Sequence, residues 1–451
     1  MEFERNLSRV QKTIFRTMPD GTTKQINPFT DMEVWTIPGR KNKPITNARP
    51  KNREKIHPDG HNGRENYCNF CEARYANTPP EKGRLMRESG NYTMLSRLNP
   101  DRVFSEAAEF RRIPNLFEIV TTDYWRKNYH YQLHGANREW KERYLSHPKG
   151  LQHVLNIVHL KLKLSGLSED DLEKKSLDEK LELATAFFCG GHELIVARKH
   201  YTARAEYTDE LCSSGELTQD EHFQYFKFTI EAMRDIYAQN RYVRYISVFQ
   251  NWLRDAGASF DHLHKQLVAL DEWGTSVERE LSLVRRYPNI YNELAVNFAS
   301  YNNLVIAEND HAIAFVDIGH IHPTLVIYSK SEHFRPPDHT DEELWGFSSL
   351  VHACHAAMGN GISCNEEWYY TPRDSMVPMP WHILIKWRIN NPAGFEGGTK
   401  IHINPMELTD LRDQMVPRLY ELRDKKIIDG FKIAEECPLQ PNCLRYNHGA
   451  A

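Results

Sequence analysis

Short apolar runs rich in β-branched and aromatic residues predict strands in two parts of the chain. In the first part, these runs lie at residues 33–37, 93–95, 116–120, 245–251 and 262–270. In the second part, they lie at residues 304–307, 312–316, 324–328, 367–371 and 381–388. The second group repeats the plan of the first in shorter form, and helices are predicted within and after it, from Thr340 and over 408–424. The chain is therefore predicted to contain a duplicated unit.

The segment from about Tyr124 to Asn240 is predicted to be mainly helical. Apolar residues recur at helical spacing over residues 150–164. Capping boxes, in which Ser or Thr is followed three residues later by Glu, begin at Ser176 and Thr218. The helix that begins after Ser176 is predicted to continue through Leu194.

Composition restricts the class of protein. The 451 residues allow two or three domains, or one large domain built from a duplicated unit. Net charge is −4, with 57 basic and 61 acidic residues, so no overall field favours nucleic acid or an anionic membrane. We find no apolar run long enough for a transmembrane helix and no signal-peptide pattern. Eight cysteines are too few for a disulfide scaffold in a chain of this length, so we expect a cytoplasmic enzyme.

The segment 257–266 is the strongest candidate for chemistry. In a strand, His262, His264 and Gln266 alternate onto one face, beside a turn with Gly257 and Ser259. Two imidazoles, an amide and a hydroxyl suit attack on a phosphorus atom, with one imidazole as nucleophile and the other groups holding the phosphoryl oxygens. The alternative is a pair of partly buried strand histidines.

The second part of the chain contains a related segment. Residues 381–386 parallel residues 261–266, with His382 set opposite His262 and Leu384 opposite His264. A duplication in which one copy has both histidines predicts one catalytic half and one half that serves architecture or closes the site.

Three weaker motifs accompany these segments. Cys68 and Cys71 are spaced to share one tetrahedral metal ion, although a redox pair has the same spacing. The loop at 38–44 presents Arg40, Lys41 and Lys43, which can clamp phosphates or lie on an ordinary solvated surface. The Gly-rich loop at 391–405 allows close approach to a ligand, with Glu396 as an acceptor for hydroxyl groups, although an ordinary surface turn has the same pattern.

Four segments follow one another in a recognisable order. They are residues 27–44, with a Pro-Phe-Thr turn and a Trp-containing strand before the basic loop; Cys68-Asn-Phe-Cys71; the run from Phe249-Gln-Asn251 through Gly257-x-Ser259 to His262-x-His264-x-Gln266; and Ala393-Gly-Phe-Glu396 followed by Asn404-Pro405. Together they resemble the galactose-1-phosphate uridylyltransferase family of the histidine-triad superfamily, and they span nearly the whole chain.

The resemblance implies an α+β fold of two histidine-triad-like repeats, each an antiparallel sheet with packed helices, that form an internal pseudo-dimer. Residues 1–275 are expected to form the N-terminal catalytic half, with a helical insertion at about 125–240. Residues 276–451 are expected to form a degenerate C-terminal half that carries the sugar and nucleotide loop at 391–405.

The resemblance also implies roles for single residues. His264 matches the nucleophile that takes a nucleoside monophosphate from a nucleotide sugar, and Gln266 matches the residue that binds the phosphoryl oxygens. The nucleotide and phosphate contacts correspond to Asn251, Ser259, Arg40 and Lys43, and the sugar contacts to Phe395 and Glu396. Arg40 and Lys43 are expected to reach the nucleotide from the partner subunit of a homodimer.

Zinc is the implied cofactor, with Cys68, Cys71 and His262 as ligands. The fourth ligand stays open among His57, His61, His130 and His134, or the site is degenerate.

The chain departs from the family pattern at two further places. Leu263 and Lys265 replace the usual Pro and Gly beside the active-site histidines. Leu384 replaces a histidine that some members use for a second metal, so that metal is not expected.

The expected activity is nucleotidyl transfer between a nucleotide sugar and a sugar 1-phosphate through a nucleotidyl-histidine. The alternative within the superfamily is a nucleotide-sugar or dinucleotide phosphorylase or hydrolase, and a third hypothesis is a non-catalytic nucleotide-binding protein. The sequence does not specify the base or the sugar.

Overall fold

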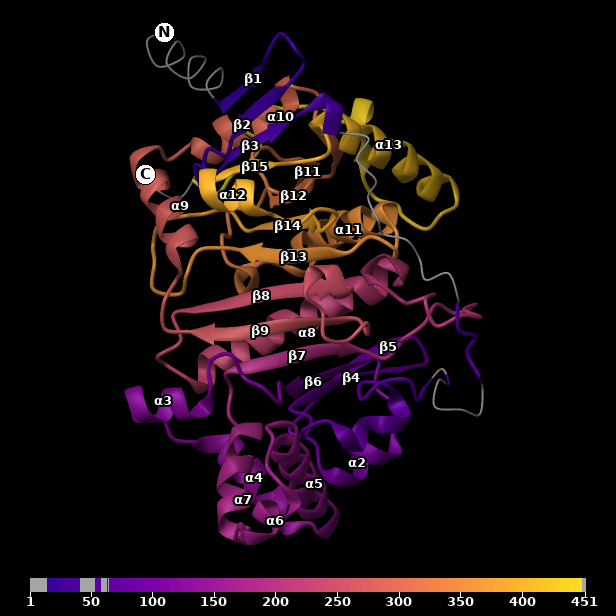
Figure 1. The fold of residues 1–451 in the computed structure, drawn as a ribbon, viewed down its shortest axis with the longest axis vertical. Helices are drawn as coiled ribbons and strands as arrows, with labels where there is room; N and C mark the ends of the chain where they lie inside the picture. The colour runs from indigo at the N-terminus through magenta and orange to yellow at the C-terminus, as the bar shows by residue number, and fades with distance from the viewer. Residues whose placement is uncertain (1–13, 41–52, 58–62, 64, 448–451) are drawn as a thin grey trace.

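The computed structural model describes residues 14–40, 53–57, 63 and 65–447. Its central feature is an antiparallel sheet in which, over these residues, twelve strands follow the order β16-β10-β11-β12-β14-β13-β8-β9-β7-β6-β4-β5 (Figure 1). The strands from the second part of the chain are β10 Val305–Glu308, β11 Ala312–Val316, β12 Thr324–Ser329, β13 Cys364–Tyr369, β14 His382–Trp387 and β16 Lys432–Ile433. Those from the first part are β4 Gly83–Glu88, β5 Asn91–Ser96, β6 Phe110–Pro114, β7 His192–Ala197, β8 Tyr245–Trp252 and β9 His264–Leu270.

Helices pack on and around this sheet. They are α2 Pro100–Ser105, α3 Thr122–Tyr129, α4 Gly135–Ser146, α5 Pro148–Leu164, α6 Glu169–Lys174, α7 Leu177–Ala184, α8 Gln219–Gln239, α9 Thr275–Arg286, α10 Asn297–Tyr301, α11 Asp341–Met358, α12 Gly394–Thr399 and α13 Leu408–Asp424. The predicted capping boxes at Ser176, Thr218 and Thr340 are all formed, at the starts of α7, α8 and α11. Among the described residues, no helix is both long enough and apolar enough to cross a bilayer.

The two faces of the sheet differ in what covers them. We call the face that carries His264 and Gln266 the site face, and the opposite face the helix face. On the helix face, Lys265 lies against aromatic rings of α8, and Glu366 is hydrogen-bonded to His355 of α11. Strand alternation therefore places the histidine and the lysine of one strand in different environments.

The two predicted repeats are present and meet along one strand pair, so the fold is α+β with an internal pseudo-dimer. Strand β8 of the first half pairs antiparallel with β13 of the second. β9 then lies beside β8, and β14 lies beside β13, so each half continues outward in the same order of strands. The exact division at residues 275 and 276 stays a prediction.

The predicted alignment of the halves is wrong by two residues. β9 begins at His264 and β14 at His382, and each imidazole donates its Nδ1 proton to the carbonyl two residues earlier, His262 O at 2.7 Å and Pro380 O at 2.9 Å. His382 is thus the counterpart of His264, not of His262. A shift of two residues keeps every side chain on its face, so the apolar pattern did not reveal it.

The counterpart site in the second half is filled. His382 is stacked between Tyr328 and Tyr369, with ring centroids at 4.7 and 5.3 Å, and is buried. The second half therefore contributes packing at this position. That only the first half is catalytic stays a prediction.

Two predicted elements in the first half are wrong. The segment 116–120 is irregular, and the strand is β6, just before it. β6 carries two charged residues, Arg111 and Arg112, whose burial with carboxylate partners hides the strand from an apolar pattern. The helix from Ser176 ends at Ala184 and does not reach Leu194, which lies in β7.

A second, four-stranded sheet packs on the far end of the molecule. Its order is β1-β2-β3-β15, with β1 Phe15–Thr17, β2 Thr23–Ile26, β3 Glu33–Thr36 and β15 Ile401–Ile403. β15 pairs parallel with β3, so the loop at 391–405 lies beside the N-terminal segment. In Figure 1 this sheet and α12 lie at the end opposite the cluster formed by α4, α5, α6 and α7.

Candidate active site and metal centre

His264 is held as a neutral imidazole with one free nitrogen. Its Nδ1–H donates to the carbonyl of His262 at 2.7 Å, which leaves the lone pair on Nε2. Burial is the main cause that lowers the pKa of His264 to about 4, so the ring is unprotonated at neutral pH. An uncharged imidazole with an accessible lone pair can act as a nucleophile.

A cavity of about 460 Å³ opens in front of this ring. His264, Gln266 and Ser259 all line it, as the sequence predicted for a shared site. The polar lining is neutral, because none of the described residues around the cavity has a carboxylate, ammonium or guanidinium group. The apolar lining includes Phe117 and Leu164, whose side chains are more than half exposed at the rim.

Two further predicted contacts lie beside the cavity. Gly257 lines it with a φ of +85°, a left-handed conformation that glycine adopts without strain. Asn251 lies on the site face of β8, lines a neighbouring pocket, and accepts a hydrogen bond from Asn365 at 2.8 Å. Contact between Asn251 and a phosphate stays a prediction.

His192 is a site residue that the sequence analysis missed. It begins β7, lines the same cavity, and places Nε2 3.0 Å from Oε1 of Gln266. His192 was missed because the helix predicted from Ser176 was expected to continue through Leu194, which hid the start of β7. The pair Gly190-Gly191 before the run Leu-Ile-Val was a signal for a new strand.

Four side chains converge on one point near the start of β9. They are Cys68, Cys71, His200 and His262. Sγ of the two cysteines are 3.8 Å apart, the sulfur–nitrogen distances are 3.4–3.9 Å, and the two Nδ1 atoms are 2.9 Å apart. Ordinary zinc bond lengths in a tetrahedron give about 3.8, 3.6 and 3.3 Å for these edges. Two thiols and two imidazoles at these distances fit a structural zinc ion.

The ring orientation of His262 supports a metal at this point. Its Nε2–H donates to Ala197 O at 2.6 Å, which leaves the Nδ1 lone pair toward the cysteines. The hydrogen bond from Cys68 is the largest cause that lowers the pKa of the Cys71 thiol, which favours a thiolate here. A metal held by His262 would fix the residue whose carbonyl orients His264.

The fourth ligand is a correction to the sequence analysis. His200 fills this position, and the metal cluster contains none of the described candidates His57, His130 and His134. His61 lies outside the described residues. His200 lies just after β7. Because part of β7 was predicted to be helical, the sequence did not show that His200 follows a strand, as a ligand at this position does.

The other predicted ligand contacts lie away from the cavity of their own chain. Arg40 ends a short 3-10 helix after β3, and Phe395 and Glu396 lie in α12, with Phe395 about half exposed. The Ala393 N–H donates to Oε2 of Glu396 at 2.9 Å and is the largest cause that lowers the pKa of Glu396. Lys43 lies outside the described residues. Their roles stay predictions.

Comparison with known proteins places this chain in a family. A family model described as a domain of unknown function, DUF4921, matches residues 18–446. The chain belongs to this family. An ADP-glucose phosphorylase from Arabidopsis thaliana is 26% identical over 186 residues, which is 40% of this chain and only 53% of that relative.

Solved structures agree on the fold of this DUF4921 protein. The crystal structure of an Arabidopsis thaliana ADP-glucose phosphorylase with bound ADP-glucose matches with a TM-score of 0.55 at 17% identity, covering 88% of this chain and 98% of the other. A GalT-like protein from the same plant matches with a TM-score of 0.52 at 16% identity and the same coverage. The resemblance to galactose-1-phosphate uridylyltransferase-like proteins is thus confirmed at the level of fold.

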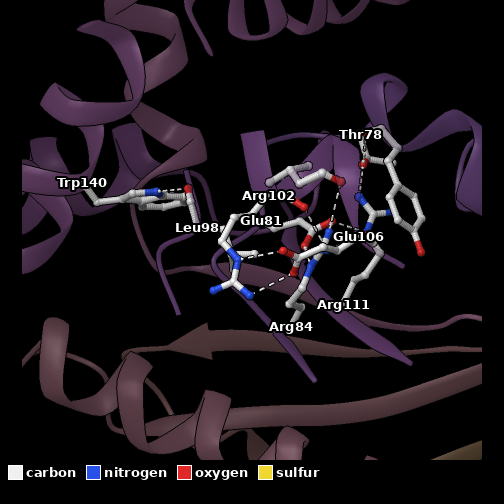
Figure 2. Close-up of polar contacts among 10 residues, drawn as sticks. Thr78, Glu81, Arg84, Leu98, Arg102, Glu106, Arg111 and Trp140 are labelled. Carbon is white, nitrogen blue, oxygen red and sulfur yellow. Dashed lines mark hydrogen bonds and ion pairs between the residues drawn. The ribbon is translucent and has the colours of Figure 1, made fainter. Parts of the chain in front are cut away.

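A buried ionic network supports one wall of the cavity in the DUF4921 protein. Figure 2 shows Glu81 between Arg84 and Arg111, with Arg84 making two contacts of 2.7 and 2.9 Å and Arg111 donating to Thr78 Oγ1 at 2.7 Å. All three charged side chains are almost fully buried. Thr78 lines the cavity, and its carbonyl is 2.9 Å from His153 of α5. The network therefore ties the cavity wall to the helical insertion.

Proposed function

We propose that this DUF4921 protein transfers a nucleoside monophosphate from a nucleotide sugar to a phosphate acceptor through a covalent bond to His264. The observation that carries this proposal is the neutral imidazole of His264, with its free Nε2 at a cavity lined by Gln266 and Ser259. The similarity to an ADP-glucose phosphorylase supports a nucleotide sugar as donor.

In the first step, Nε2 of His264 attacks the α-phosphorus of the donor. The bond from that phosphorus to the bridging oxygen breaks, and the sugar 1-phosphate leaves with the electron pair. The ring then carries positive charge, which the hydrogen bond from Nδ1 to the His262 carbonyl stabilises. Gln266 and Ser259 can donate hydrogen bonds to the phosphoryl oxygens while the bonds change.

In the second step, an oxygen of the acceptor phosphate attacks the same phosphorus, and the bond to Nε2 breaks. A sugar 1-phosphate as acceptor yields a new nucleotide sugar, which is the transferase reaction expected from the sequence. Inorganic phosphate yields a nucleoside diphosphate, which is the phosphorylase reaction favoured by the name of the 26% identical relative.

Zinc, when bound, would supply structural cross-linking and no chemistry on the substrate. Cys68, Cys71, His200 and His262 would hold it. Because His262 contributes both a ligand nitrogen and the carbonyl that accepts the His264 proton, the metal would set the direction of the catalytic ring.

A homodimer would complete the site. The cavity of one chain lacks charged side chains among its described lining, whereas a donor with two phosphates carries negative charge. Arg40 follows β3 and Glu396 lies in α12 just before β15, which pairs with β3 at the far end of the molecule, where the partner's cavity could receive these residues. We propose that Arg40, Lys43, Phe395 and Glu396 act across the dimer.

Isotope exchange tests the two-step route. The protein is incubated with a panel of nucleotide sugars and the matching labelled sugar 1-phosphate, without another acceptor. Label should enter the nucleotide sugar, since the covalent step is reversible, and His264→Ala should abolish the exchange. Exchange that persists in His264→Ala would refute the proposal. Products formed with inorganic phosphate or a second sugar 1-phosphate then separate phosphorylase from transferase.

A further inference from the structure

His192 and Gln266 form a hydrogen-bonded pair on the site face, next to His264. His192 in β7 lies diagonally across from Gln266 in β9, and Nε2 of the ring is 3.0 Å from Oε1 of the amide. Both side chains line the cavity, and His192 is only 2% exposed. The pair is therefore fixed by the sheet and directed at the reaction site.

The direction of this hydrogen bond is set by the backbone. The N–H of Ile119 donates to Nδ1 of His192 at 3.1 Å, so Nδ1 must lack a proton. Burial lowers the pKa of His192, so the ring is neutral and its one proton is on Nε2. Nε2–H therefore donates, and Oε1 of Gln266 accepts.

A second amide near the ring does not change this assignment. Nδ2 of Asn115 lies 3.1 Å from Nε2 of His192. Oδ1 of Asn115 already accepts from the N–H of Phe117 at 2.9 Å, so Asn115 presents its NH₂ group, which is not an acceptor. With the proton on Nε2, the approach of this NH₂ group to the ring is a contact between two donors and not a hydrogen bond. Among the hydrogen bonds of the described residues, Gln266 provides the acceptor for the His192 proton.

We propose that His192 is a positioning residue that holds the amide of Gln266 with its NH₂ group available to phosphoryl oxygens. An amide can invert by rotation of its last torsion, and the inverted form would place Oε1 against negatively charged phosphoryl oxygens. His192 prevents inversion because it occupies Oε1 from the other side. The inference rests on the proposed function, because it gives Gln266 its orientation for that transfer.

The hydrogen bond from the Ile119 N–H to His192 connects the cavity rim to the orientation of the Gln266 amide. Ile119 belongs to the segment 115–119, whose apolar side chains line the cavity rim. The backbone that fixes the tautomer of His192 thus also carries side chains in reach of the substrate. Contacts at the rim and the orientation of Gln266 are coupled through one hydrogen bond.

Kinetic variants test the positioning role. His192→Phe keeps a ring but removes the donor, and should slow single-turnover formation of the nucleotidyl adduct about tenfold, as loss of an orienting hydrogen bond commonly does. Donor affinity should stay within about twofold, because the orienting contact matters most as charge develops in the transition state. His192→Gln should retain most of the rate, since its amide nitrogen reaches the place of Nε2.

A double variant separates positioning from packing. In a Gln266→Ala background, His192→Phe should cause no further loss of rate, because the group that it orients is absent. Equal rates in His192→Phe and His192→Gln, or an undiminished effect of His192→Phe in the Gln266→Ala background, would overturn the proposal.

The tautomer gives a readout that does not depend on activity. In protein labelled with ¹⁵N-histidine, the signal of His192 is assigned by its loss in His192→Gln, and it should show protonation at Nε2 alone at neutral pH. Protonation at Nδ1, or at both nitrogens, would overturn the inference. If the wild-type protein forms no adduct with any donor, the proposed function fails, and the tautomer then decides whether His192 holds Gln266.

Discussion

Loss of the Lys265 charge is predicted to destabilise the fold far more than it slows catalysis. Lys265 follows His264 in sequence but lies on the helix face, where its Nζ is 2.6 Å from Oε1 of Glu366. Neither side chain has measurable exposure. The rings of Tyr225 and Phe226 lie 4.8 and 5.1 Å from the ammonium. Since Glu366 belongs to the second half, the pair joins the two repeats next to His264 in the sequence.

The contacts that remain after each substitution set the magnitude. Removing one partner of a buried ion pair costs about 3–5 kcal/mol of unfolding free energy. In Lys265→Met, Glu366 still accepts from Trp368 at 2.7 Å and contacts His355 at 2.9 Å, so we expect about 3 kcal/mol, at the low end of that range. In Glu366→Gln, the ammonium is left with Gln250 at 3.4 Å and an uncharged amide, so we expect about 5 kcal/mol.

Equilibrium unfolding in urea and thermal unfolding, both followed by circular dichroism, measure these losses. For a chain of this length that unfolds as one unit, the typical entropy per residue gives a fall in Tm of about 1 °C per kcal/mol. The double variant Lys265→Met/Glu366→Gln should be no less stable than the worse single variant, because no unpaired charge is left buried.

Activity separates this account from a direct role in catalysis. Folded Lys265→Met should retain most of the turnover, since its side chain faces away from the cavity. Losses of stability that simply add in the double variant, or a Lys265→Met protein as stable as the wild type, would refute the reasoning. A stable Lys265→Met protein that had lost turnover would place the charge in the chemistry instead.

Three further predictions follow from other parts of the molecule. Cys68→Ser and His200→Ala should each lower the zinc content and the Tm of the protein. A zinc content equal to that of the wild type would show that these residues do not bind zinc. Burial lowers the pKa values of His339 and His352 to about 4. Between about pH 6.5 and pH 4 the unfolded chain therefore binds more protons than the folded protein, so the free energy of unfolding should fall as the pH drops through this range. A constant free energy of unfolding over that range would contradict the burial of these two histidines. Leu164→Asp at the cavity rim should raise the donor KM with little change in Tm, and an unchanged KM would place the rim outside the substrate site.

The elements that the sequence predicted well have local signals. The three capping boxes and the helix α13 depend on residues close together in the chain, and the strands of the second half are continuous apolar runs. The strand β9, which carries the candidate site residues, was predicted because His264 and Gln266 alternate onto one face. All of these features are visible within about ten residues.

The elements that were missed depend on distant partners. β6 contains two arginines that are buried only because Glu81 and Glu193 meet them from other segments. The apolar segment 116–120 was mistaken for a strand because its side chains line a cavity instead of a core. With β7 hidden inside a predicted helix, His192 and His200 had no strand to place them, and both the metal ligand and the partner of Gln266 were overlooked.

The most direct test of the central claim is the mass of the intact protein after incubation with nucleotide sugars in the absence of an acceptor. The account predicts a gain of one nucleoside monophosphate, which also identifies the base. The gain should be absent in His264→Ala and present in His382→Ala, the counterpart in the filled second half. An adduct that persists in His264→Ala, or no adduct with donors that the protein demonstrably consumes, would contradict a nucleotidyl-histidine intermediate at His264.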